Sequence, residues 1–168
     1  RPMGVVKELV ENAIDAGSTR IQITIEEGGL SKITIMDNGC GMDASDAQMC
    51  FERHATSKIH AQNDLWSIHT LGFRGEALPS IAAVSKVTLS TSDGTDATRV
   101  IIAYGRKESA SPYPCNQGTE ITVEGLFYQT PARLKHMRSG SYEASLIQDV
   151  ISRFAMSHPE IAFHFIND

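Results

Sequence analysis

The feature of this sequence that most constrains the fold is an alternation of apolar and polar side chains over residues 20–37, interrupted once by a Gly-Gly pair. Alternation on both sides of such a pair predicts a β-hairpin. In its second strand Ile33, Ile35 and Asp37 share one face, because successive side chains point to opposite sides. The face expected to carry the apolar core therefore ends in a carboxylate, which is costly to bury unless a polar group meets it.

The rest of the chain combines helical and strand patterns. Apolar residues at helical spacing predict amphipathic helices over residues 4–16 and 142–158. A second hairpin and a further strand are predicted at residues 87–91, 98–104 and 118–125. The pattern as a whole predicts an α+β fold with helices over one face of a largely antiparallel sheet.

Length and local composition predict a single domain. The 168 residues, 41% hydrophobic and 21% charged, suffice to bury a core without disulfides. The chain opens inside a helical pattern and stops after an alternating run, so we expect one domain over residues 1–168, truncated at both ends. Ser, Pro and Gly make residues 105–118 the least structured stretch expected, and Thr130-Pro131 is typical of a helix start.

Cysteine use and charge exclude several protein classes. Cys40, Cys50 and Cys115 are scattered without a C-x-x-C pair, which indicates neither a zinc site nor a disulfide framework and favours a reducing cytoplasm. There is no apolar run that would cross a membrane and no signal-peptide pattern, so we expect no membrane partner and no secretion. The net charge of −5 argues against the whole fragment being a nucleic-acid clamp.

The first predicted helix carries a line of polar residues. Glu8 and Asn12 are four residues apart and therefore stack on one face, and Asp15 falls on the same line, opposite the apolar stripe. One interpretation is a solvated acidic face. The other is a carboxylate beside a carboxamide in a cleft, where the carboxylate takes a proton from water and the amide oxygen suits Mg²⁺.

A second candidate site precedes a helical pattern that begins near Glu76. Gly72 and Gly75 flank Arg74 there. Glycines that lead into a helix N-terminus expose backbone N–H groups suited to phosphate, although a simple loop gives the same pattern. The stretch is neither a Walker P-loop nor a dinucleotide-binding G-x-G-x-x-G.

Five motifs together resemble the N-terminal ATPase domain of the MutL family of DNA mismatch-repair proteins: VVKELVENAIDAG, MDNGCGM, RHATSKI, LGFRGEAL and GTEITVEGLFYQTPAR. The resemblance extends from Val5 to about Arg153. The helix with the pattern E-x-x-x-N and the pattern D-x-G-x-G after it resemble motifs of the wider GHKL superfamily, which includes gyrase B, heat-shock chaperones and histidine kinases. The stretches ATSKI and GFRGEA resemble the MutL family specifically. The resemblance implies a two-layer α/β sandwich of GHKL (Bergerat) type, with a mixed, mostly antiparallel sheet and helices on one face.

The resemblance also implies residue roles. Glu8 corresponds to the general base that deprotonates the attacking water, Asn12 to the Mg²⁺ ligand, and Asp37 to the acceptor of a hydrogen bond from the adenine amino group. Gly39 and Gly41 would let the backbone pass close to that base.

Thr119 shares strand parity with Ile121 and is therefore predicted to face inward, where the family has a threonine near the same acid. A plain strand hydroxyl is an equally good interpretation. The remaining implied nucleotide contacts lie in the loop that wraps the triphosphate and in the lid: Gly72, Phe73, Arg74, Gly75, Thr56, Ser57 and Lys58.

The implied function is slow, Mg²⁺-dependent ATP hydrolysis that drives dimerisation and couples mismatch recognition to downstream repair. The implied cofactors and partners are ATP or ADP, Mg²⁺, a second N-terminal domain, a MutS-type mismatch-recognition protein and, weakly, DNA. The expected location is the bacterial cytoplasm at the nucleoid, or the nucleus of a eukaryote. Since related repair proteins take a γ-phosphate lysine from a following domain, we expect the isolated fragment to be weakly active or inactive.

Three alternatives remain open from the sequence. One is a nucleotide-binding or scaffold fragment of another GHKL branch without turnover. Another is a phosphotransferase of the histidine-kinase branch, for which no acceptor-histidine helix is visible. The third concerns a basic run that is either a solvated face or a DNA-backbone contact: Arg133, Lys135, His136 and Arg138.

Overall fold

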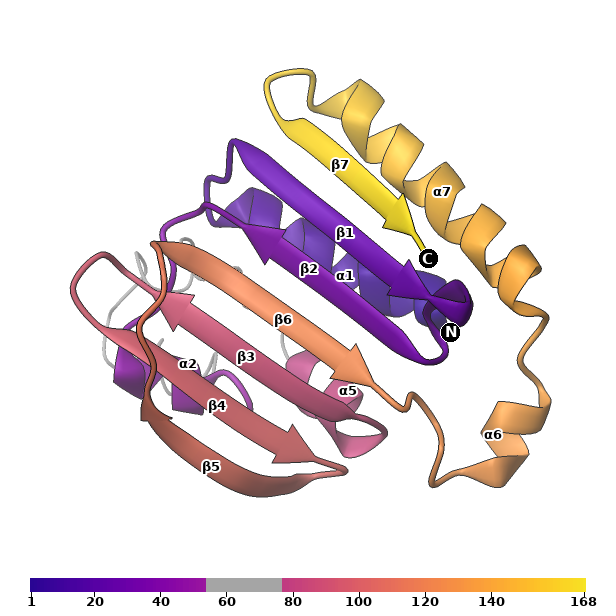
Figure 1. The fold of residues 1–168 in the computed structure, drawn as a ribbon, viewed down its shortest axis with the longest axis horizontal. Helices are drawn as coiled ribbons and strands as arrows, with labels where there is room; N and C mark the ends of the chain where they lie inside the picture. The colour runs from indigo at the N-terminus through magenta and orange to yellow at the C-terminus, as the bar shows by residue number, and fades with distance from the viewer. Residues whose placement is uncertain (54–76) are drawn as a thin grey trace.

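The computed structural model describes residues 1–53 and 77–168, which form a seven-stranded sheet in the order β5-β4-β3-β6-β2-β1-β7 (Figure 1). Neighbouring strands are antiparallel except for β1 and β7, which are parallel. The strands are β1 (Arg20–Glu26), β2 (Lys32–Asp37), β3 (Lys86–Ser92), β4 (Ala97–Ala103), β5 (Arg106–Pro112), β6 (Gly118–Glu124) and β7 (Ala162–Asn167). The predicted mixed, mostly antiparallel sheet is confirmed.

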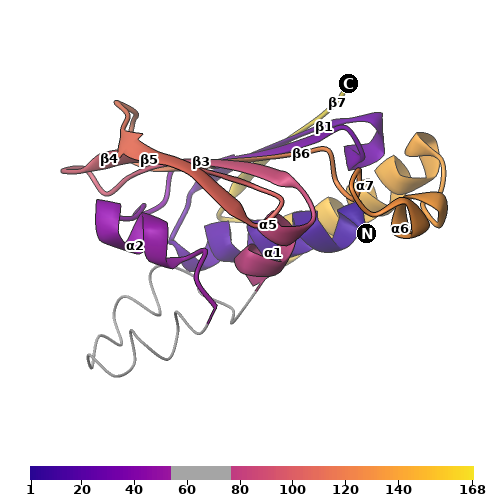
Figure 2. The ribbon, with the colours of Figure 1, turned by 90° about the horizontal axis from the view of Figure 1, so that it is seen from below.

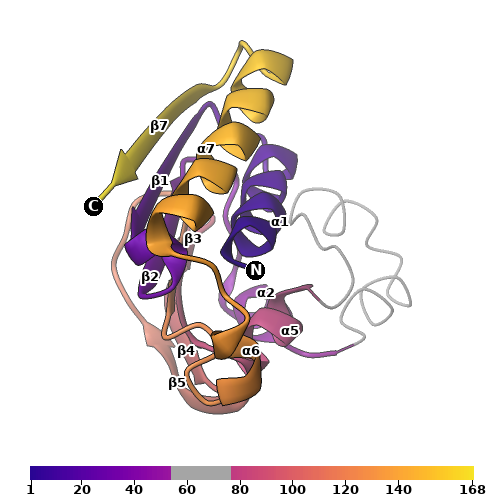
Figure 3. The ribbon, with the colours of Figure 1, turned by 90° about the vertical axis from the view of Figure 1, so that its right-hand side faces the viewer.

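All described helices lie on one face of this sheet, as Figures 2 and 3 show. The two long ones, α1 and α7, run side by side, and none of the described helices is long and apolar enough to span a membrane. The helices are α1 (Pro2–Asp15), α2 (Ala44–Met49), α5 (Ala77–Ala83), α6 (Pro131–Lys135) and α7 (Gly140–Ser157), and a short 3₁₀ turn, η1 (Glu27–Gly29), joins β1 to β2. This arrangement confirms the predicted α+β sandwich.

The core lies between the helices and the inward face of the sheet. Helix α1 buries Val6 and Val10 fully, which are part of the predicted apolar stripe. They pack in one cluster with isoleucines of the predicted hairpin, such as Ile23 and Ile33, which are also fully buried. Burying these branched side chains contributes about 2 kcal/mol each, so the helix and hairpin stabilise one another mainly through apolar contact.

One prediction about the fold is wrong. The Ser, Pro and Gly content of residues 105–118 predicts the least structured stretch of the chain, but Arg106–Pro112 forms strand β5 at the edge of the sheet. Tyr104 and Gly105, both at positive φ, form the tight turn that returns the chain from β4. Strand β5 is exposed along nearly all of its length, so it shows no apolar alternation, and its backbone pairing with β4 has no sequence signature.

Candidate functional site

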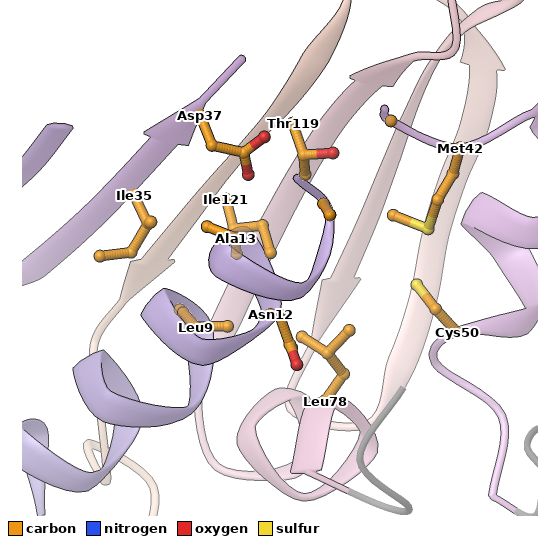
Figure 4. A pocket seen from close by; sticks show the side chains of 12 residues that line it. Leu9, Asn12, Ala13, Ile35, Asp37, Met42, Cys50, Leu78, Thr119 and Ile121 are labelled. Atoms are coloured by element: carbon orange, nitrogen blue, oxygen red, sulfur yellow. The ribbon is translucent and has the colours of Figure 1, made fainter. Parts of the chain in front are cut away.

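A pocket lies between α1 and the inward face of β2 and β6 (Figure 4). Its walls are largely apolar, and three side chains, from α1, β2 and β6, supply most of its polar groups. Ligand sites typically combine apolar walls with a few directed polar groups. The lining residues are Leu9, Asn12, Ala13, Ala16, Ile35, Asp37, Gly41, Met42, Cys50, Leu78, Thr119 and Ile121.

The register of β2 on β6 brings the predicted acid and threonine together. Ile35 pairs with Ile121, and two residues further on Asp37 pairs with Thr119. Because side chains alternate along each strand, both pairs face α1. The predicted inward direction of Asp37 and Thr119 is confirmed, and Figure 4 shows their side chains projecting into the same region of the pocket.

The environment of Asp37 favours a neutral carboxyl more than water does. Burial raises its pKa from 3.8 to about 6, against the opposing effect of the Gly39 backbone N–H, which donates to Oδ1 at 2.8 Å. A half-buried carboxylate has two oxygens, so beside the Gly39 N–H it retains further acceptor capacity. Asp37 is therefore suited to accept hydrogen bonds from a ligand that enters the pocket.

The glycines after β2 allow the chain to pass close to other backbone. Gly41 has φ +67°, and a Cβ there would clash with the carbonyl oxygen of Ser92 in β3. A Cβ at Gly39 would lie 2.8 Å from the carbonyl oxygen of Ala16, at the end of α1. Both glycines thus hold the segment after Asp37 tightly against the wall of the pocket.

The polar line on α1 divides into two parts. Glu8 Oε2 and Asn12 Oδ1 are buried and have no hydrogen-bond partner among the described residues, whereas Asp15 is exposed. The solvated-face interpretation therefore fits Asp15 but not the other two residues. Buried oxygens without partners are costly and uncommon, so Glu8 and Asn12 are candidates for binding a ligand.

Thr91 lies behind the pocket wall and contacts a residue that lines it, and the predictions from sequence do not include this role. It lies on β3, is fully buried, and contacts three segments around the pocket through its hydroxyl. The available signal was parity: Thr91 follows Val87 and Leu89 on the inward face of its strand, just as Asp37 follows two isoleucines on β2.

The other predicted site residues belong to the lid and to the loop that wraps the triphosphate. The lid and triphosphate-loop residues lie outside the described ranges: Thr56, Ser57, Lys58, Gly72, Phe73, Arg74 and Gly75. Within residues 1–53 and 77–168 no group of three or more His, Cys, Asp or Glu side chains could hold a metal ion. In that part of the chain, a hard cation at this pocket would have few protein ligands, and Asn12 Oδ1 is an oxygen of the appropriate kind.

Comparison with known proteins adds an independent result. A family model described as histidine kinase-, DNA gyrase B- and HSP90-like ATPase matches residues 1–128. The DNA mismatch repair protein MutL of Streptococcus thermophilus is 57% identical over the whole of this chain, which spans 26% of that protein. MutL of Listeria innocua is 54% identical over 98% of this chain and 28% of its own length. The chain thus spans about a quarter of these relatives.

Solved structures show the same fold. The Aquifex aeolicus MutL ATPase domain complexed with ADP has a TM-score of 0.79 and 25% identity, covering 99% of this chain and 60% of that one. A topoisomerase IV ATP-binding domain of Francisella tularensis, in complex with a small-molecule inhibitor, has a TM-score of 0.67 at 14% identity, covering 99% of this chain and 82% of that one. The latter similarity concerns the fold alone.

Proposed function

Because the chain belongs to the histidine kinase-, DNA gyrase B- and HSP90-like ATPase family, in its MutL branch, we propose that residues 1–168 form an ATP-binding domain whose pocket under α1 holds the nucleotide. One observation carries the proposal. Glu8 and Asn12 lie on one face of α1, and each has a buried oxygen without a hydrogen-bond partner among the described residues. Asn12 lines the same apolar pocket as the half-buried Asp37.

The adenine end of the nucleotide is proposed to lie against Asp37 and Thr119. Their side chains meet at one region of the pocket, and the ionised carboxylate accepts a hydrogen bond from the adenine amino group. Apolar neighbours such as Ile35 and Ile121 contact the faces of the base. Gly39 and Gly41 allow the chain after Asp37 to pack closely against Ala16 and Ser92, and the backbone at Gly41 is proposed to form one wall beside the base.

The triphosphate end is proposed to lie along the polar face of α1. Asn12 Oδ1 would be the protein ligand of a magnesium ion, which supplies charge neutralisation on the phosphates when bound. Glu8 lies one turn away on the same face and would accept a proton from the attacking water. Residues 56–58 and 72–75 are proposed to complete the phosphate site as lid and loop.

Hydrolysis is proposed to be slow and to serve a conformational switch in the full-length protein. Phosphoryl transfer depends on positioning and charge neutralisation, and a cation for the γ-phosphate is proposed to come from a lysine beyond Asp168. ATP binding would dimerise two N-terminal domains and couple a MutS-type mismatch-recognition protein to later repair steps, with weak, non-specific DNA contact. The matched MutL relatives are bacterial, and we propose that this chain acts at the nucleoid of a bacterial cytoplasm.

A titration of the full-length protein with a fluorescent ATP analogue tests the proposal. Saturable, Mg²⁺-enhanced binding is expected, together with phosphate release at a low rate and no labelled protein acceptor. Binding without phosphate release would leave the alternative of a nucleotide-binding scaffold. Absence of binding would reject the nucleotide pocket itself.

A further inference from the structure

The hydroxyl of Thr91 links the three segments that enclose one end of the pocket. Thr91 lies on β3 and is fully buried. Its Oγ1 is 3.0 Å from the backbone nitrogen of Met42, 3.0 Å from the carbonyl oxygen of Gly118 and 2.9 Å from Oγ1 of Thr119. One side chain thus contacts the segment after β2, the start of β6 and the threonine that lines the pocket.

These contacts determine the direction of each hydrogen bond. A hydroxyl has one hydrogen to donate and two lone pairs to accept with. The carbonyl of Gly118 can only accept, so the Thr91 hydrogen points to it, and the Met42 N–H can only donate, so it occupies one lone pair. The contact with Thr119 must then use the second lone pair of Thr91, which makes Thr119 the donor.

A consequence follows for the group that faces the ligand. Because the only hydroxyl hydrogen of Thr119 points to Thr91, its Oγ1 presents lone pairs alone to the pocket. Its register partner Asp37 is also an acceptor when ionised. The two side chains therefore form a pair that receives hydrogens, either from an amino group or from a water molecule that bridges to one.

We propose that Thr91 is a positioning residue for base selectivity: by accepting the Thr119 hydroxyl hydrogen, it makes this end of the pocket an acceptor-only surface that favours a 6-amino purine over a 6-oxo purine. Thr91 itself does not line the pocket and acts through Thr119. The proposal rests on the proposed binding of ATP with its base at Asp37 and Thr119. It identifies what sets the chemistry of that contact.

ATP and ITP are the probes: ITP has an oxygen in place of the 6-amino group and an N1–H in place of the N1 lone pair, so this edge of its base offers one hydrogen instead of two and adds an acceptor at position 6. Affinities are measured on the full-length protein at about pH 8, where Asp37 is ionised. In Thr91→Val the hydroxyl of Thr119 is released and can turn to donate to the ITP oxygen. The ATP-to-ITP affinity ratio is expected to narrow by at least about fivefold, the worth of one hydrogen bond.

Two variants separate this role from a merely structural one. Thr91→Ser keeps the hydroxyl, and the ratio should stay within about twofold of the parent. Thr98→Val makes the same change at the buried threonine directly opposite on β4, outside the network, and should also leave the ratio unchanged. A loss of packing alone would lower the affinity for ATP and for ITP by the same factor and leave the ATP-to-ITP affinity ratio unchanged.

The outcomes distinguish this inference from the proposed function. If the parent binds ATP and Thr91→Val leaves the ratio unchanged, the positioning role of Thr91 is wrong while the nucleotide pocket stands. If the parent binds no ATP, the proposed function fails first. If Thr91→Val does not fold, Thr91→Cys is measured in its place, because its S–H is only a weak hydrogen-bonding group. If the ATP-to-ITP ratio shifts as much in Thr91→Ser as in Thr91→Cys, the positioning role of Thr91 is equally wrong.

Discussion

Asp37 and Thr119 are register partners across β2 and β6, and their side chains line one pocket under α1 (Figure 4). The preceding pair on the same face, Ile35 and Ile121, is apolar. A polar pair therefore ends an apolar ladder at the point where the strands leave the core. Two acceptors in apolar surroundings give directional recognition, since a ligand that offers no hydrogen to them leaves a carboxylate poorly solvated.

Asp37→Asn is expected to weaken ATP binding by roughly a hundredfold at neutral pH. The amide replaces one acceptor oxygen by an N–H₂ group that would face the adenine amino group, and the lost charge-assisted bond and unmet donor cost about 2–3 kcal/mol. Titration of the full-length protein with a fluorescent ATP analogue measures the effect. An affinity within about threefold of the parent would mean that Asp37 does not hold the base.

The same substitution is expected to stabilise the ligand-free protein, and more so at about pH 7.5 than at about pH 4.5. Burial raises the pKa of Asp37 from 3.8 in the unfolded chain to about 6 in the folded protein. The folded state therefore binds the Asp37 proton more tightly than the unfolded state does. The resulting contribution of Asp37 to the free energy of unfolding is fully present below pH 3.8 and is lost as the pH rises through about 6. The neutral amide avoids this loss.

Thermal unfolding at the two pH values checks the sign, with Asp93→Asn as the control. The backbone N–H groups of Thr95 and Asp96 hold the pKa of Asp93 below its usual value, so this carboxylate is ionised at both pH values. The Tm change of Asp93→Asn should be the same at both. A Tm change of Asp37→Asn that also does not vary with pH would show that the carboxyl is not perturbed by burial.

The parts of the fold that the sequence predicts are those set by local periodicity. The hairpin over residues 20–37 and the stripe of α1 follow from spacing alone, and the inward direction of Asp37 follows from strand parity. The sequence does not predict edge strand β5, because both of its faces are exposed and its residues therefore show no apolar alternation. The parallel pairing of β7 with β1 depends on a long connection that no local pattern encodes.

The candidate site also has residues that the sequence predicts and a residue that only the structure identifies. Glu8 and Asn12 are found by helical spacing, and Asp37 and Thr119 by parity, because each of these signals lies within one element. The hydrogen-bond network of Thr91 lies across three segments that are distant in sequence. Which hydroxyl donates and which accepts depends on the atoms that these segments bring together, so only the tertiary structure reveals it.

Gly41→Ala is expected to destabilise the protein far more than Gly17→Ala. Both glycines have positive φ, at +67° and +77°, so each alanine incurs a backbone strain of about 1–2 kcal/mol. At Gly17 the added Cβ meets no atom within 4 Å, whereas at Gly41 it clashes with the Ser92 carbonyl. We expect at least about 2 kcal/mol of additional loss at Gly41 in urea unfolding. Equal losses would show that the segment does not need this close approach to β3.

Variants at Glu8 and Asn12 are expected to separate chemistry from binding. A general base contacts the water and not the nucleotide, so its carboxylate matters mainly in the transition state. In the full-length protein, Glu8→Ala should retain ATP affinity and ATP-induced dimerisation while hydrolysis falls by about 10²–10⁴-fold. Asn12→Ala removes the proposed metal ligand and should instead weaken Mg²⁺-dependent nucleotide binding.

The matched control for both is Asp15→Ala, on the same line of α1 but exposed, which should change neither quantity. Binding is measured with and without Mg²⁺, and hydrolysis by phosphate release under saturating ATP, so that a change in affinity is not mistaken for one in rate. Loss of binding in Glu8→Ala with binding retained in Asn12→Ala would mean that the two roles are exchanged or wrong. If neither variant altered hydrolysis, the two buried oxygens would have no part in the reaction, and the polar face of α1 would not be the phosphate side of the pocket.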